Sequence, residues 1–140
     1  MKLALKNIKV FPTVMVLLVL SVIVTQCYVP TEVRALNKKL ASDDYLNQYP
    51  YHFKVLTLEN GVATMSSPRS SRVSVPEMIG TIVPELQNPS LDDPRYLKAQ
   101  KDLADHQAYA RRLVIEDMKV KSVRWRLDKR WLRERGIMVE

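Results

Sequence analysis

The sequence has one cysteine, two histidines and three glycines among its 140 residues. Cys27 has no second cysteine to pair with, so an intramolecular disulfide is excluded. His52 and His106 lie far apart in the chain, and no further cysteine could join them as a metal ligand. We therefore expect no zinc site, and no residue pattern indicates a cofactor.

Catalytic motifs are also missing. The serines within 66–71 have no nucleophile elbow and no nearby histidine in the sequence. The aspartate pairs 43–44 and 92–93 occupy positions typical of helix ends rather than of an acid–base pair. The sequence predicts a protein that is not an enzyme, while a site assembled from distant residues stays open as an alternative.

One long apolar run is present. Twenty residues, Val10 to Val29, carry no charged side chain, and a helix of that length spans roughly 30 Å, the thickness of the hydrocarbon core of a bilayer. The residues 25–30 contain no small-residue cleavage site, and Gln26 rather than a small residue precedes Cys27. A retained transmembrane anchor is therefore favoured over a cleaved signal or a lipidated cysteine, and both of these stay open.

Basic residues flank this run on both sides. Three lysines precede it within 1–9, and Arg34, Lys38 and Lys39 follow it. The positive-inside rule favours a cytoplasmic amino terminus. We expect a protein of the bacterial inner membrane with a periplasmic carboxyl-terminal domain. The predicted organisation is a basic segment over 1–9, the anchor over 10–29, a helical stalk over 30–50 and a small α+β domain over 51–140.

The charge is distributed unevenly along the exported part. Residues 30–110 carry nine Lys/Arg and ten Asp/Glu, whereas residues 111–135 carry ten Lys/Arg and four Asp/Glu. Clustered cations favour anionic partners such as lipid headgroups, nucleic acid or acidic protein surfaces. We expect no nucleic acid, because an exported domain rarely meets it and no recognition motif accompanies the charge.

Local patterns predict the first elements of the domain. Apolar residues recur at helical spacing after Pro30, which indicates the stalk helix. Two runs rich in strand formers, 53–58 and 62–65, flank Asn60-Gly61. Asn-Gly accepts the positive φ values of a type I′ turn, so we predict a β-hairpin over about 52–66.

The polar stretch 66–72 follows the hairpin, and it combines four serines with Arg69 and Arg72. Guanidinium and hydroxyl groups could together bind a phosphate or a carboxylate. A solvated connection is the simpler interpretation. Residues 72–75 are predicted to form a third strand of the same sheet.

The carboxyl-terminal half begins with a helix signal. Asp92-Asp93-Pro94 supplies acids and a first-turn proline, and neither glycine nor proline recurs before Gly136. A long helix to about Met118 is predicted. Beyond it, residues 119–127 alternate like a strand, yet the apolar side chains also fit helical spacing, and we favour a helix over 123–135.

That helix predicts a basic face and an apolar face. The cations Arg126, Lys129, Arg130 and Arg133 share one side, and Trp125 and Trp131 are the large aromatic side chains nearby. Such a helix can lie on an anionic membrane surface. The alternative, which we favour, is that the tryptophans pack into the small core and the cations form its solvated side.

Several short strings resemble a group of small bacterial membrane-anchored proteins. These strings are Met65-Ser66-Ser67-Pro68-Arg69-Ser70, Asp93-Pro94, Ala110-Arg111 and Val123-Arg124-Trp125-Arg126-Leu127-Asp128. Some members carry the name glutamate–ammonia-ligase adenylyltransferase. A nucleotidyltransferase of that type needs Gly-Ser followed by paired aspartates, and this chain contains no Gly-Ser. The resemblance implies an anchored small protein without an established activity.

The sequence as a whole predicts an α+β protein. Its expected parts are an N-terminal transmembrane helix, an antiparallel β-hairpin sheet and a long C-terminal helix. The leading functional hypothesis is a non-catalytic interaction or assembly module with a protein partner in the cell envelope. The alternative is a peripheral binder of anionic lipid that uses the basic C-terminal segment. The candidate interaction residues are Arg69, Arg72, Arg126, Lys129, Arg130, Arg133, Trp125 and Trp131.

Overall fold

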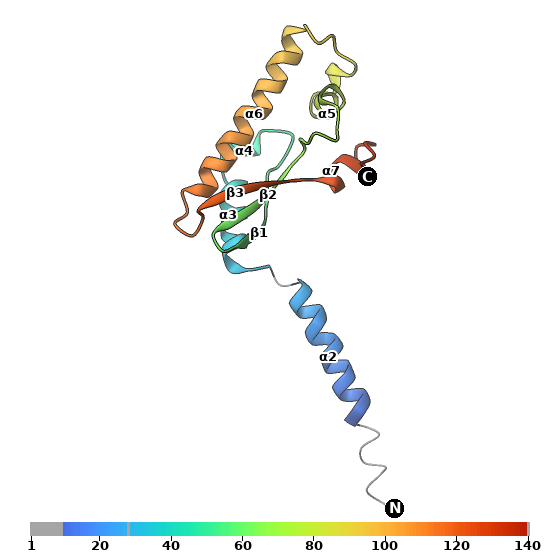
Figure 1. Cartoon of the computed structure of the whole chain (residues 1–140), viewed down its shortest axis with the longest axis vertical. Helices are drawn as coiled ribbons and strands as arrows, with labels where there is room; N and C mark the ends of the chain where they lie inside the picture. The colour runs from blue at the N-terminus through green and yellow to red at the C-terminus, as the bar shows by residue number, and fades with distance from the viewer. Residues whose placement is uncertain (1–9, 28, 140) are drawn as a thin grey trace, which may run out of the picture. The chain divides into compact units, whose positions relative to one another are not determined.

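The computed structural model of the chain describes residues 10–27 and 29–139. The chain divides into two compact units, Met1–Pro30 and Thr31–Glu140. Figure 1 shows the elements of each unit.

Helix α2 in the first unit covers Val10–Cys27. The side chains from Val14 to Leu20 are apolar, and each is 48–61% exposed. In the part of the chain that the structure describes, no helix combines the length and the apolar character needed to cross a membrane. The basic segment 1–9 and the side chain of Cys27, on which parts of the anchor prediction rest, lie outside the described residues.

The second unit is an α+β domain, which confirms the predicted class. Three strands form its sheet in the order β1-β2-β3. β1 and β2 run antiparallel and β2 and β3 run parallel, so the sheet is mixed rather than antiparallel throughout. The elements are α3 (Thr31–Ala41), α4 (Asp44–Asn47), β1 (Val55–Glu59), β2 (Val62–Ser67), α5 (Val75–Ile82), the 3₁₀ helix η1 (Pro84–Leu86), α6 (Pro94–Ile115), β3 (Ser122–Leu127) and α7 (Lys129–Arg133).

The predicted hairpin is present as β1 and β2. Asn60 and Gly61 connect the strands with φ values of 51° and 82°, the left-handed conformation that the Asn-Gly pair was expected to adopt. The Gly61 carbonyl accepts the N–H groups of Lys121 at 2.7 Å and of Ser122 at 3.2 Å. The turn therefore also holds the beginning of β3.

The long helix is confirmed as α6. Asp93 caps its first turn by accepting the N–H of Arg95 at 2.9 Å, and Pro94 occupies the first helical position. The helix ends at Ile115, a few residues before the predicted end. Together with α5, which packs against α6, it forms the crossover that a parallel β2–β3 pair requires (Figure 1).

Two predicted elements are wrong. Residues 72–75 do not form a strand, because α5 starts at Val75 with Pro76 in its first turn. The helix expected over 123–135 is instead strand β3 followed by the short helix α7. Six residues of β3 pair with β2 from Val62↔Ser122 to Ser67↔Leu127. This pairing with a distant strand selects the strand pattern over the helical pattern that we favoured.

Helix α3 belongs to the domain, which differs from the separate stalk predicted over 30–50. Val33, Leu36 and Leu40 share one helical face and are only 1–3% exposed. The Asn37 amide donates to the Val55 carbonyl at 2.8 Å and its oxygen accepts the Val55 N–H at 2.7 Å. This pair of bonds covers the beginning of β1, an edge that would otherwise expose its backbone groups.

Two buried tyrosines close the core between α4 and β1. Tyr51 is 1% exposed, and its hydroxyl donates to Asp128 Oδ2 at 3.3 Å. Tyr49 is 8% exposed, and among the described residues its hydroxyl has no hydrogen-bond partner. Burial is the main cause that raises the pKa of both phenols above the ordinary value.

Replacing each of these two tyrosines by phenylalanine is expected to change the free energy of unfolding in different ways. Tyr51→Phe is expected to lower the free energy of unfolding by about 0.5–1.5 kcal/mol, because it removes a hydrogen bond. Tyr49→Phe is expected to leave it unchanged or to raise it, because it removes a buried hydroxyl without a partner. Urea unfolding of the full chain, followed by tryptophan fluorescence, measures both changes. Equal losses in the two variants would contradict the assignment.

The hairpin turn gives a second prediction. Gly61→Val is expected to destabilise the domain by about 1–2 kcal/mol, since a β-branched residue is strained at a φ of 82°. Gly61→Asn is the matched control, because asparagine tolerates this conformation while its Cβ would meet the same Lys121 side-chain atoms, 2.9 Å away. Thermal melting followed by tryptophan fluorescence should place the midpoint of the valine variant clearly below that of the asparagine variant.

Candidate functional site

Strand β3 places cationic and apolar side chains on opposite faces of the sheet. Arg124 and Arg126 are exposed, whereas Trp125 and Leu127 are half-buried on the other face. The register sets Arg126 beside Ser66 of β2. The alternation follows from the two-residue period of a strand, and it separates residues that a helix would have grouped differently.

Asp128 ends β3 and starts α7. Its N–H donates to the Ser67 carbonyl at 2.8 Å, which continues the pairing with β2. Its Oδ1 accepts the Trp131 N–H at 3.0 Å and caps α7. Its Oδ2 accepts the Tyr51 hydroxyl. Both carboxylate oxygens therefore already accept hydrogen bonds within the fold.

Cations from three parts of the chain meet around this joint. A pocket of about 390 Å³ lies where the segment before β1, the end of β3 and the start of α7 come together. We call it the basic pocket. Its lining is Lys54, Leu56, Ser66, Arg126, Leu127, Asp128, Lys129 and Arg130. Four cations thus surround one carboxylate that is committed to capping.

Intramolecular ion pairs compensate little of this charge. Among the described residues, Arg130 is the one pocket cation with an ion-pair partner, and its Nε lies 4.0 Å from Glu134 Oε1. The Arg130 side chain is 85% exposed, so this pair contributes little to stability. The positive potential of the pocket therefore remains available to an anion from outside the domain.

The predicted basic amphipathic helix is not formed. Arg133 lies outside the basic pocket, and its Nε donates to the Lys129 carbonyl at 3.3 Å. The Trp131 ring packs edge-on against Tyr51 with centroids 5.1 Å apart, and the Arg135 guanidinium lies 4.0 Å from the centroid of the Trp131 ring. Leu132 is fully buried. The favoured alternative, in which the tryptophan packs into the core, agrees with this arrangement.

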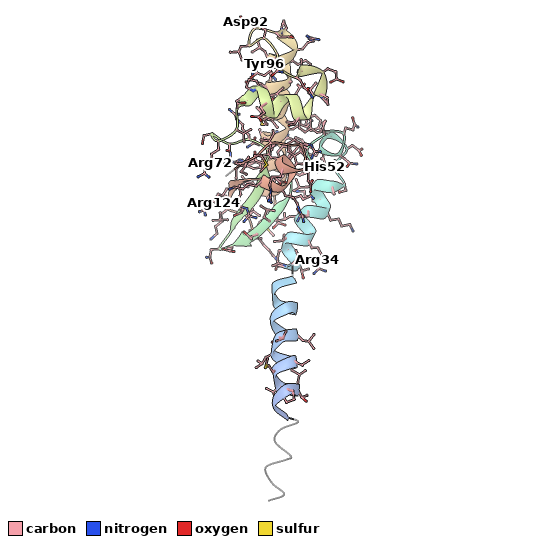
Figure 2. The ribbon with its side chains drawn as sticks, turned by 90° about the vertical axis from the view of Figure 1, so that its right-hand side faces the viewer. Arg34, His52, Arg72, Asp92, Tyr96 and Arg124 are labelled. Carbon is pink, nitrogen blue, oxygen red and sulfur yellow. The ribbon has the colours of Figure 1, made fainter. Side chains whose placement is uncertain are left out.

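The two arginines of the loop after β2 separate. Arg69 lines a second pocket together with Trp125 and residues of α6. Arg72 lines neither pocket, and its N–H donates to Ser70 Oγ at 2.9 Å. Figure 2 shows Arg72 and Arg124 on the same side of the domain.

Two serines at the end of β2 accept hydrogen bonds from backbone N–H groups. Ser66 Oγ accepts the Lys54 N–H and Ser67 Oγ accepts the Arg69 N–H, each at 3.1 Å. Both serines are buried, at 2% and 0% exposure. The anion site considered for residues 66–72 is therefore not built from the loop alone.

Sequence reasoning missed three cations that line pockets. Lys54 faces Ser66 because the hairpin register sets them together: the Ser66 N–H donates to the Lys54 carbonyl at 2.8 Å. That register could have been extended from Asn60-Gly61. Arg111 and Arg112 line the second pocket, and only the packing of α6 against β3 brings them near Arg69 and Trp125.

Metal binding and relationships to known proteins add no further assignment. In residues 10–27 and 29–139, no group of three or more His, Cys, Asp or Glu side chains is placed to hold a metal ion. Comparisons with protein-family models, with curated proteins and with solved structures find no match for this chain.

The joint at Asp128 gives a third prediction. Asp128→Ala is expected to lower the free energy of unfolding by about 1–2 kcal/mol, since it removes the cap of α7 and the acceptor of the Tyr51 hydroxyl. Asp128→Asn keeps an oxygen that can accept the Trp131 N–H, and its loss in free energy of unfolding is expected to be less than half of that in Asp128→Ala. Urea unfolding compares the two variants, and equal costs would show that the cap contributes little.

Proposed function

We propose that this chain is a membrane-anchored, non-catalytic interaction module of the bacterial envelope that binds an acidic segment of a partner protein in the basic pocket. The observation that supports this proposal is the convergence of four cations from three parts of the chain around a carboxylate that accepts hydrogen bonds within the fold. A segment with several carboxylates can meet these cations together, which adds specificity and speeds association.

The exposure of the cations suits such a partner. Lys54, Arg126, Lys129 and Arg130 are all exposed, and Ser66 beneath them is buried. The pocket is an open surface at the end of the sheet, where exposed cations surround the half-buried side chains of Leu56 and Leu127. Such surfaces contribute more to the rate and selectivity of binding than to its final strength, so the interaction is expected to weaken with salt.

A peripheral lipid binder is the alternative proposal. Insertion into a bilayer interface needs exposed apolar side chains beside the cations. In α7, Leu132 is fully buried and Trp131 packs against Tyr51, so the two large apolar side chains of this helix are already used in the core. This arrangement favours a protein partner over a lipid surface.

The localisation rests on the first unit. The exposed side chains from Val14 to Leu20 are all apolar and cover every side of α2. A helical segment of this kind is best accommodated in an apolar environment. The proposed topology keeps the amino terminus in the cytoplasm and the domain Thr31–Glu140 in the periplasm.

A charge-neutral variant of the basic pocket tests the partner proposal. We expect K54Q, R126Q, K129Q and R130Q together to weaken binding of a fluorescein-labelled hexaglutamate peptide by about tenfold or more, because each substitution removes one charge. The measurement is fluorescence anisotropy on the full chain in phosphatidylcholine nanodiscs, at low and high salt.

The control variant removes the same total charge elsewhere. K38Q, K98Q, K101Q and K119Q change cations outside the pocket, and this variant is expected to keep the affinity of the native chain for the peptide. If the chain in nanodiscs floats together with phosphatidylglycerol vesicles but does not bind the peptide, the lipid alternative is supported. Equal peptide binding by both variants would mean that the pocket is an ordinary solvated surface.

The anchor gives a further prediction. The full chain is expected to remain in the membrane fraction after alkaline carbonate extraction, and protease added to spheroplasts is expected to digest the domain. The double variant L17R/L18R is the control. Each arginine in the middle of an apolar helix opposes insertion by about 2.5–3.5 kcal/mol, so we expect this variant to appear in the soluble fraction after extraction. Full-length native protein in the soluble fraction would contradict the anchor.

A further inference from the structure

A second pocket, of about 500 Å³, lies between α6 and the sheet. Its charged side chains are Arg69, Arg111 and Arg112, and Trp125 forms part of its wall. None of its lining residues is acidic. We call it the arginine pocket. Its size lies in the range of sites that hold small organic molecules.

Helix α6 uses two different faces to build the core and this pocket. Leu103 and Val114 are buried in the core. Ala104, Ala108 and Arg111 follow one another at spacings of three and four residues and line the pocket. The two alanines leave room beside the helix that longer side chains would fill. The pocket therefore has a small apolar floor with guanidinium groups at its edge.

The three arginines come from two parts of the chain, and no acidic side chain lines the pocket with them. Among the described residues, Arg69 and Arg111 form no ion pair. The Arg112 guanidinium lies 5.1 Å from the centroid of the Tyr109 ring, so its contact is a cation–π contact rather than an ion pair. Clustered cations without counter-charges repel one another, and a bound anion would remove that repulsion.

The backbone that carries Arg69 is well fixed. Its N–H donates to Ser67 Oγ at 3.1 Å, and Pro68 between them is buried. Ser67 itself is the last residue of β2 and is fully buried. Arg69 therefore extends from a rigid point at the end of the sheet, which limits the entropy lost when its side chain binds a ligand.

We propose that the arginine pocket binds a phosphate ester with a planar or apolar organic part. Guanidinium groups match the geometry of phosphate oxygens and can donate two parallel hydrogen bonds. Trp125 and the alanines offer an apolar surface to the organic part. A free phosphorylated metabolite and a phospholipid headgroup share this chemistry. The site is separate from the basic pocket and does not depend on the proposed protein partner.

Phenyl phosphate is the first probe, because it combines a ring with a phosphate dianion. It is titrated into the full chain in dodecyl maltoside micelles, which carry no phosphate, with binding followed by calorimetry and tryptophan fluorescence. We expect phenyl phosphate to bind about tenfold more tightly than inorganic phosphate. Arg69→Gln and Arg111→Gln are each expected to weaken its binding about tenfold or more.

Matched controls separate the site from general positive charge. Arg124→Gln and Arg133→Gln remove exposed cations that do not line the pocket, and both are expected to keep the native affinity. Arg69→Lys keeps the charge but loses the bidentate geometry, so its affinity should fall between those of the native chain and Arg69→Gln. Thermal melting of each variant confirms that the domain is folded.

Two further ligands distinguish the sources of the phosphate. Glycerol 3-phosphate represents a soluble ester, and dihexanoyl phosphatidic acid represents a lipid headgroup. Tighter binding of the first supports a soluble ligand, tighter binding of the second supports a headgroup, and either result needs Arg69 and Arg111. If no phosphate ester binds, or if the arginine variants bind as well as the native chain, the pocket is only a solvated surface and the proposal is wrong.

Discussion

The parallel pairing of β3 with β2 is the interaction on which the rest of the domain depends. It joins residues 122–127 to residues 62–67, and the crossover between them contains α5, η1 and α6. Its ladder sets Trp125 beside Met65 and Arg126 beside Ser66. Without this pairing, the C-terminal cations would have no fixed positions and neither pocket would have its walls.

A small polar network at Asp128 completes this pairing. The carboxylate caps α7 and accepts the Tyr51 hydroxyl, while the N–H extends the ladder to Ser67. Tyr51 is nearly fully buried, so its hydroxyl needs such a partner. The network ends β3 and starts α7, and Lys129 and Arg130 line the basic pocket together with Lys54.

Both candidate sites follow from the alternation along β3. Arg126 on one face contributes to the basic pocket, and Trp125 on the other contributes to the arginine pocket. The basic pocket carries four exposed cations around the half-buried side chains of Leu56 and Leu127, and these cations suit an acidic segment of a protein. The arginine pocket has an aromatic wall and a floor of small side chains, which suits a small ester. One edge strand thereby contributes to both candidate anion sites.

Some features of this domain were determined by the sequence alone. Asn60-Gly61 required a turn, and Asp93-Pro94 required a helix start, because these residues restrict the backbone through their own covalent structure and short-range hydrogen bonds. Residues 122–127 were different, since their apolar side chains fit both a strand and a helix. We favoured a helix there from the sequence, and hydrogen bonds to a strand far away in the chain decided for β3.

The candidate sites show the same division. The excess of cations near the carboxyl terminus can be counted in the sequence, because charge belongs to each residue separately. Which cations lie together depends on strand pairing and helix packing. Lys54 and Arg126 line the same pocket because of the hairpin and the pairing of β3. Arg111 and Arg69 line the same pocket because α6 packs against the sheet. The sequence determined the sign of the charge, and the tertiary structure decided its grouping, because only long-range contacts bring these residues together.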